Sequence, residues 1–477
     1  MIKIYLKILY ILLIINKILT KTFSIKLPFK TLYEYEQINS PEKYFETKFF
    51  NEPITLLTIG TNHQSIPCLL SINTYTLYIS GSNSSLKENQ PKYEEFKSIK
   101  YQNLSNKYQY ESTYTYGIAS LDEIYLNNND IITDLKFYLA KSKFTSDELI
   151  YSCIIGLGYE GIFYDYEDEN KIKIGSFITQ MKNNGIIHKK IFFINYSKNH
   201  DNINDINDNG EIIFGVYPHE IKNNYCDNCY EEDFIEIENN FIVDTDIIWS
   251  IKGYVYVGEN KIYDYLSSID FELNQGFIIG SKDYKEYIET NFFNEKISEK
   301  QCFKKEIYIN QNIFETFFCE KNINLSKFEN LMIYISKIKY EIKFTYKDIF
   351  LFDEKNNCLF FSIIFMKNEF NYKHDFVFGK PFFKKYPIVF NVEGIVEKIG
   401  FYYNLFVSQE KEKKDDKNRE YKTNIKYRHW NAIKIFLISI GILIIGLLIY
   451  IIKKFFFKKK KKKVDELIEF FDYSTVK

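Results

Sequence analysis

The residue types that most often perform chemistry form few groups in this chain. Cys226 and Cys229 make a single Cys-x-x-Cys pair. That pair could be half of a zinc site, but no second pair of cysteines or histidines lies nearby to complete it. The six histidines are scattered and form no His-Glu-x-x-His sequence, and no phosphate-binding Walker sequence is present. The sequence therefore predicts neither a metal nor a cofactor.

The overall charge is nearly balanced, with 62 Lys and Arg against 63 Asp and Glu in 477 residues. This balance argues against a nucleic-acid-binding protein, which usually carries a basic excess on its folded part. Because 45% of the residues are hydrophobic, the chain can build a core.

The first residues predict export. Lys3 and Lys7 precede an apolar run over residues 8–15, which is typical of a secretory signal peptide. We assign the signal peptide to residues 1–22. An uncleaved signal anchor is the alternative, although the run is short for a membrane span.

The last residues predict a membrane anchor. Residues 435–452 carry no charge; Lys453 and Lys454 follow at once, and six more lysines run from Lys458 to Lys463. An apolar segment of this length can cross a bilayer as a helix, and lysines stay on the cytosolic side. We expect a transmembrane helix at 433–452, a cytosolic tail at 453–477 and a charged stalk at 408–430. The predicted topology is single-pass type I, with the ectodomain outside the cell or in the secretory or endolysosomal lumen.

Export also affects the cysteines and the glycosylation sequons. All seven cysteines lie between the predicted signal peptide and the stalk, so we expect disulfides, and the odd number leaves at least one thiol unpaired. Sequons for N-glycosylation, which we expect on surface loops, begin at Asn83, Asn103, Asn195 and Asn324.

The elements between the two ends read as short strands. Apolar stretches such as 191–194 and 360–365 alternate with turns rich in Asn, Gly, Ser and Asp, a pattern that predicts an all-β fold. Residues 176–185 form the clearest candidate for a short helix.

Several of these segments, in this order and spacing, resemble the pepsin-like aspartic peptidases (peptidase A1). The segments are Ile59-Gly60-Thr61 with Gln64, Cys153 to Gly158, Ser176 to Lys182, Gly210 to Gly215, Phe378 to Phe382 with Tyr386, Val389-Phe390, and Ile399-Gly400-Phe401. The resemblance runs from about Asn51 to Tyr403. It implies a two-lobed all-β fold with a central cleft between the lobes that accepts a peptide.

The resemblance also suggests a domain plan and several site residues. The N-terminal lobe would cover 51–216 and the C-terminal lobe 217–407, with 23–50 as a pro-segment-like or N-terminal strand region. Tyr116 and Gly117 look like the flap that closes over bound peptide. Cys319 and Cys358 stand where such proteins often hold a disulfide in the C-terminal lobe.

The reaction of this family needs two facing carboxylates that share one proton, one from each lobe. In the first lobe Ser71 stands at the Asp position and Asn73 at the position of the motif's glycine. No shift of the alignment supplies an aspartate, because the first one in the chain is Asp122. Asn can adopt the left-handed backbone of a glycine, whereas a serine hydroxyl cannot replace a carboxylate that must ionise.

In the second lobe the matching triplet is Glu272-Leu273-Asn274. Glutamate is one methylene longer than aspartate, which displaces its oxygens in a reaction that depends on close positioning. Asp270 is the alternative if two residues are inserted. Either way the aspartate pair is not intact.

Three functions follow from these residues. The first is a membrane-anchored, catalytically inactive relative that binds a peptide or protein in its cleft. The second is an active aspartic-type endopeptidase that uses Ser71 and Glu272. The third is a surface glycoprotein without a working cleft.

Overall fold

The computed structural model describes residues 24–31, 52–84, 91–110, 116–126, 131–140, 152–158, 172, 174–196, 209–221, 229–240, 249–309, 312–353, 356–367, 375–394 and 396–403. All of them belong to one compact unit that spans residues 1–406. The predicted signal peptide, stalk, transmembrane segment and tail lie outside these residues. Within the described part of the chain, no helix is both long and apolar enough to cross a bilayer.

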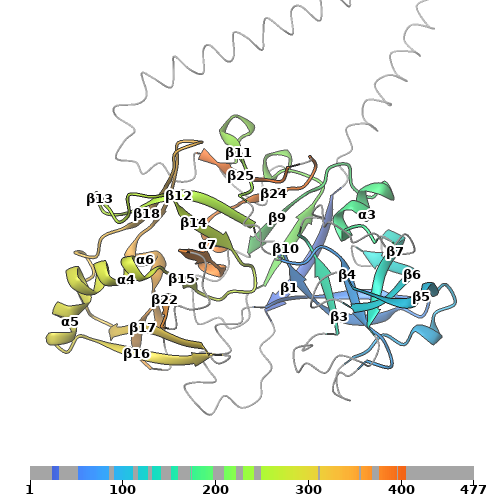
Figure 1. Cartoon of the computed structure of the whole chain (residues 1–477), viewed down its shortest axis with the longest axis horizontal. Coiled ribbons are helices and arrows are strands. Elements are labelled where there is room, and N and C mark those ends of the chain that lie inside the picture. Colours follow the sequence, from blue (N-terminus) through green and yellow to red (C-terminus); the bar gives the residue numbers. More distant parts are fainter. Residues whose placement is uncertain are drawn as a thin grey trace, which may run out of the picture. The chain divides into compact units, whose positions relative to one another are not determined.

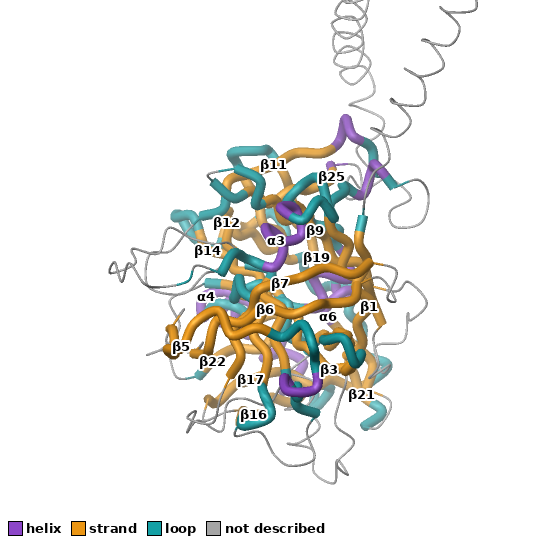
Figure 2. The backbone as a smooth tube through the Cα atoms, turned by 90° about the vertical axis from the view of Figure 1, so that its right-hand side faces the viewer, coloured by secondary structure: helices purple, strands orange, loops and turns teal. Residues whose placement is uncertain are grey.

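Strands dominate the described residues, and the expected all-β architecture is confirmed (Figure 2). Among the described residues, thirteen strands form the first sheet, in the order β11-β25-β24-β9-β10-β1-β2-β3-β8-β4-β7-β6-β5. Their bounds are β1 Ile25–Thr31, β2 Pro53–Ile59, β3 Gln64–Ser71, β4 Leu77–Ser80, β5 Gln102–Tyr110, β6 Tyr116–Leu126, β7 Ile131–Ala140, β8 Cys153–Gly156, β9 Ile191–Tyr196, β10 Asn209–Phe214, β11 Phe234–Glu238, β24 Val389–Asn391 and β25 Lys398–Tyr402.

The second sheet is formed by the C-terminal half, which Figure 1 shows in yellow and orange beside the blue and green N-terminal half. Its main order is β19-β18-β12-β14-β23-β15-β22-β17-β21-β20, with β13 on β12 and β16 on β17. The bounds are β12 Trp249–Val257, β13 Asn260–Lys261, β14 Ser267–Phe271, β15 Ile278–Ile279, β16 Cys302–Ile309, β17 Asn312–Glu320, β18 Leu331–Ile335, β19 Tyr340–Phe344, β20 Phe350–Asp353, β21 Cys358–Phe361, β22 Ile363–Met366 and β23 Phe376–Phe378.

The helices are short and connect strands. They are α3 Phe177–Asn183, α4 Lys282–Ile288, α5 Asn294–Ser298, α6 Tyr346–Ile349 and α7 Lys380–Lys385, with single turns η1 Glu95–Lys97, η2 Pro218–Glu220, η3 Glu231–Asp233 and η4 Glu289–Phe293. The predicted helix at 176–185 is confirmed as α3. It begins where Ser176 accepts a hydrogen bond from the backbone N–H of Thr179, as an N-cap serine does.

Side-chain alternation explains how the strands build layers. In β2, Leu57 and Ile59 are buried while Leu56 is 67% exposed, the period of a half-buried strand. In β17 both faces are covered, because Phe317 and Phe318 pack into two different hydrophobic clusters.

The two halves of the chain share one sheet. Strand β24, near the end of the described residues, pairs with β9 from the N-terminal half, with Phe390 opposite Phe192. The two rings stack at 4.8 Å, and Trp249 packs edge-on against Phe390, also at 4.8 Å. The fully buried Trp249 thus adds apolar contacts to the interface between the two halves.

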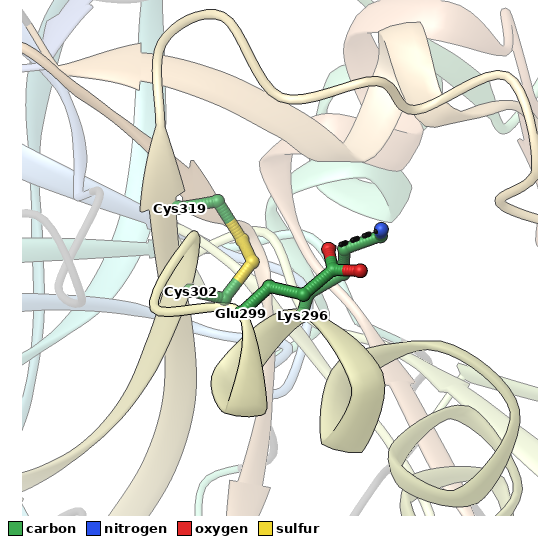
Figure 3. The surroundings of a disulfide bond; sticks show 4 residues. All are labelled: Lys296, Glu299, Cys302 and Cys319. Atoms are coloured by element: carbon green, nitrogen blue, oxygen red, sulfur yellow. Dashed lines mark hydrogen bonds and ion pairs between the residues drawn. A yellow bond between two sulfur atoms is a disulfide. The ribbon is translucent and has the colours of Figure 1, made fainter.

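Disulfides join Cys68 to Cys153 and Cys302 to Cys319. The second bond links directly opposite residues of the β16–β17 hairpin, and Figure 3 shows it beside Lys296 of helix α5 and Glu299, the residue that ends this helix. These pairings confirm that the chain contains disulfides.

The expected Cys319–Cys358 disulfide is wrong, because Cys358 is a free thiol. On the paired strands β17 and β21, Cys319 lies opposite Leu359, and Cys358 lies opposite Glu320. Since neighbouring residues of a strand point to opposite faces of the sheet, Cys319 and Cys358 project away from each other. Spacing along the chain could not reveal this one-residue offset.

Candidate active-site loops

The first candidate loop leaves the end of β3 and returns as β4. Strand β8 lies between these two strands: it pairs in parallel with β3, with Ser71 opposite Gly156, and antiparallel with β4, with Leu77 opposite Ile155. The backbone N–H of Leu157 donates to the carbonyl of Ser71 at 2.7 Å. Ser71 is therefore held in place by backbone contacts, and it is buried.

The glycine that follows Leu157 is required by the close approach of this loop. A Cβ on Gly158 would lie 2.7 Å from the carbonyl oxygen of Ile72 and 2.8 Å from that of Thr74. The N–H of Gly158 also donates to the Thr74 carbonyl at 2.6 Å. The Gly-Leu-Gly segment thus holds the loop by backbone contacts, which explains the sequence pattern.

The C-terminal half repeats the arrangement. Strand β23 pairs in parallel with β14, with Phe271 opposite Phe378, and antiparallel with β15, with Ile278 opposite Phe378. The N–H of Glu272 donates to the Phe378 carbonyl at 3.0 Å. Here a Cβ on Gly379 would lie 2.2 Å from the carbonyl oxygen of Gln275.

The strand pairing around the first loop matches the strand pairing around the second, residue by residue. Leu77 is the first residue of β4, and it lies opposite the residue that precedes Gly156. Ile278 is the first residue of β15, and it lies opposite the residue that precedes Gly379. Ser71 precedes Leu77 by the same number of residues as Glu272 precedes Ile278. The register thus places Glu272 at the position that matches Ser71. Asp270 lies inside β14 instead, opposite Ser250 and Val377.

A side-chain hydrogen bond connects the two loops. Asn73 Nδ2 donates to Glu272 Oε1 at 3.3 Å, and the backbone N–H of Asn73 donates to Ser71 Oγ, also at 3.3 Å. Asn73 and Glu272 are half-buried. The structure therefore brings Ser71, Asn73 and Glu272 into one cluster, with a single carboxylate, one amide and one hydroxyl.

Sequence reasoning missed the part played by the Asn73 side chain. It treated Asn73 only as a residue that tolerates the backbone of a glycine, whereas its amide reaches the opposite loop. The available signal was that both motif glycines, not one, are replaced by asparagine, at 73 and 274. The residues between, Ile72 and Leu273, are buried in the main hydrophobic cluster.

Asp122, the first aspartate in the chain, is engaged elsewhere. Its fully buried carboxylate accepts hydrogen bonds from Tyr93 Oη, from Ser98 Oγ at 3.0 Å and from the N–H of Glu123 at 2.7 Å. Burial, and then the contact with Asp122, raise the pKa of the Tyr93 hydroxyl. These hydrogen bonds connect the segment before β5 to strand β6.

The residues expected to form the flap lie on the β5–β6 hairpin. Tyr116 pairs with Tyr110 and Gly117 with Gln109, while the side chain of Tyr116 lies outside the described part of the chain. A Cβ on Gly117 would lie 2.9 Å from the carbonyl oxygen of Leu139 on β7. The close approach of β6 to β7 therefore explains why residue 117 is a glycine.

The sequons differ in their surroundings. Asn83, Asn103 and Asn324 are exposed, whereas Asn195 is half-buried within β9. Among the described residues no group of three His, Cys, Asp or Glu side chains could hold a metal ion. Cys229 of the Cys-x-x-Cys pair is disulfide-bonded, so it is not a zinc ligand here.

Two loops of matching register, each held by a glycine-containing strand, meet through the hydrogen bond between Asn73 and Glu272 in an all-β molecule, an arrangement consistent with a pepsin-like fold. Residues 53–252 match the family model for eukaryotic aspartyl protease, and the resemblance to the pepsin-like peptidases is confirmed over that segment. The match includes Ser71 and ends before Glu272. A search of curated proteins found no significant match.

Proposed function

We propose that this protein is a catalytically inactive, membrane-anchored relative of the pepsin-like peptidases that binds a peptide or protein between its two loops. The observation that carries the proposal is the composition of the cluster: Glu272 is its one carboxylate, and Ser71 occupies the matching position on the other loop.

The chemistry of peptide hydrolysis explains why this composition favours binding over catalysis. The reaction needs one carboxylate to take a proton from water while a protonated partner polarises the scissile carbonyl. The hydroxyl of Ser71 stays neutral in the working pH range and cannot share a proton with Glu272. In addition, the Asn73 amide donates to Glu272 Oε1 and competes with water for that oxygen.

Membrane anchoring is part of the proposal and is supported by the sequence alone. The uncharged segment at 435–452, followed by lysines, would fix the ectodomain on the non-cytosolic side. Expression of the full chain in cells, followed by alkaline carbonate extraction and protease protection, tests this. Release of the chain into the carbonate supernatant would contradict it.

The catalytic part is tested by incubating the purified full chain with denatured protein at pH 3 to 6, with and without pepstatin. We expect no pepstatin-sensitive cleavage. The matched variant carries Ser71→Asp, Asn73→Gly, Glu272→Asp and Asn274→Gly. Cleavage by this variant alone would show that the scaffold persists and only the chemistry is lost, whereas wild-type cleavage that Glu272→Gln abolishes would refute the proposal.

A second candidate is an active endopeptidase that uses Ser71 and Glu272, favoured by the family match over residues 53–252. Wild-type cleavage in the same assay would establish it. A third candidate is a surface glycoprotein without a working cleft, favoured by the exposed sequons at Asn83, Asn103 and Asn324.

A further inference from the structure

The turn η2 follows β10, the last strand of the N-terminal half, and His219 is its central residue. The His219 side chain is half-buried and lies among aromatic rings. It stacks on Tyr217 at 5.2 Å, and it contacts Phe234 of β11 at 5.6 Å and Tyr402 of β25 at 5.9 Å. Strands β11 and β25 belong to the first sheet, so His219 connects the turn to two strands of that sheet.

The hydrogen bonds of Tyr402 determine which protonation state of His219 fits. Tyr402 Oη lies 2.8 Å from His219 Nδ1 and accepts the backbone N–H of His219 at 3.4 Å. Burial raises the pKa of the Tyr402 hydroxyl, which therefore keeps its proton. Within the described part of the chain, Nδ1 is the one acceptor that this O–H reaches, so we assign the hydroxyl as donor and Nδ1 as acceptor. The imidazole is then neutral, with its own proton on Nε2.

A second proton on this imidazole must bind to Nδ1, the nitrogen that already accepts from Tyr402. Two protons would then face each other, and Tyr402, which is fully buried, would have to turn its O–H away from its acceptor. A buried donor without an acceptor costs free energy. The geometry therefore disfavours the protonated form of His219.

Nearby charges act on His219 in both directions. Glu220 on the same turn and Glu231 and Glu232 on η3 favour the protonated form. Lys189, which precedes β9, opposes it. Burial has the largest effect and lowers the pKa of His219 below its ordinary value of 6.5. Since a released turn would have the ordinary pKa, it binds more protons than the held turn in acid, and a falling pH favours release.

We infer that His219 and Tyr402 form an acid-sensitive latch, which holds the turn η2 against β25 at neutral pH and releases the turn in acid. The ion pair between Lys189 and Glu220 attaches the same turn to the segment before β9, so the release concerns its contact with β25. The strands β11 and β25 stay paired with each other through their own backbone. The latch is independent of the proposed function, because no ligand between the two loops takes part in it.

The test measures backbone hydrogen exchange in residues 216–221 of the purified full chain by mass spectrometry at pH 7.5 and pH 5.5. Rates are corrected for the intrinsic effect of pH on exchange. The ordinary pKa of histidine limits the increase in opening between these two pH values to about ten-fold. We expect a loss of protection of more than about three-fold. Peptides from β9 in the same sample should keep their protection.

Variants assign the effect to His219. His219→Asn keeps an amide oxygen as acceptor and cannot be protonated, so its protection should change by less than about two-fold between the two pH values. His63→Asn is the matched control, because His63 is exposed and its φ of 53° is one that asparagine adopts. This control should lose as much protection in acid as the wild type. Tyr402→Phe removes the hydrogen bond and should lower the protection already at pH 7.5.

The wild type alone can overturn the inference, by losing less than about three-fold of its protection between pH 7.5 and pH 5.5. An equal loss in His219→Asn and in the wild type overturns it as well, because another group would then be the sensor. Circular dichroism melting curves show whether each variant is folded. If His219→Asn lacks protection already at pH 7.5, His219→Gln, whose amide oxygen also accepts, takes its place. The assay contains no peptide, so its outcome leaves the proposed function untouched.

Discussion

Replacing Cys302 and Cys319 together with serine should destabilise the folded β-sheet unit, whereas Cys358→Ser should not. The disulfide closes a loop with a sequence separation of 17 residues. In the chain-entropy description, a loop of this length lowers the entropy of the unfolded chain enough to contribute about 3 kcal/mol. Cys358 is a half-buried thiol without a disulfide, so its replacement by the similarly sized serine should change the unfolding free energy by less than about 1 kcal/mol.

Urea denaturation of the full chain, followed by tryptophan fluorescence, measures both changes, since Trp249 is fully buried at the joint between the halves and should respond to unfolding. The Cys68–Cys153 disulfide allows a comparison. Its sequence separation of 85 residues predicts that replacing both cysteines lowers the free energy of unfolding by about 4.5 kcal/mol. Alkylation under non-reducing conditions and peptide mass spectrometry identify the thiol directly.

The competing pairing gives the opposite result. If Cys319 were bonded to Cys358, then Cys358→Ser would be as destabilising as loss of the partner, and Cys302 would be the alkylated residue. Either observation would refute the assignment of the β16–β17 bond and the side-chain alternation argument behind it.

Three further changes test other parts of the structure. Gly379→Ala should lower the free energy of unfolding by about 3 kcal/mol in urea titrations, because the new Cβ would lie 2.2 Å from a backbone oxygen. Gly394→Ala is the control: its nearest atom is 3.4 Å away, and it should cost less than about 0.5 kcal/mol. Equal losses in the two variants would contradict this. Tyr93→Phe should cost about 2 kcal/mol by the same measurement, since it removes a donor from the buried Asp122 carboxylate, and an unchanged midpoint would refute that role. Burial raises the pKa of Glu52 from 4.5 to about 8, so the folded state keeps a proton that the unfolded chain releases, and stability falls as the pH rises between these values. Glu52→Gln should therefore raise the melting temperature at pH 8 and leave it nearly unchanged at pH 4; a wild-type-like melting curve at pH 8 would contradict the shift.

Much of the fold could be predicted from local patterns. The helix predicted over 176–185 is local in origin, because Ser176 caps its first turn with a hydrogen bond to a residue three positions on. The Gly156-Leu157-Gly158 segment was one of those that carry the family resemblance, and the structure gives the reason for its second glycine in the backbone contacts of Gly158. These predictions depend on residues close together in the chain.

The remaining features depend on register and on contacts between distant segments. Cys319 and Cys358 both lie on strands of one sheet, but the face to which each points is set by strand pairing, which sequence spacing does not determine. The contact between Asn73 and Glu272 joins residues 199 positions apart. It depends on two loops meeting, so residue type alone could not indicate which atom of the amide would face the carboxylate.

The pairing of β9 with β24 constrains how the polypeptide is made. Strand β1, which begins at Ile25, and strands β24 and β25, at the end of the described residues, belong to the same sheet. Domains generally fold as units during synthesis, and pairing between distant segments must wait for both to emerge. The nascent chain therefore carries an incomplete sheet with an open edge on β9 until residues 389–402 are translated, and a premature stop codon shortly before that point would leave this edge open to aggregation.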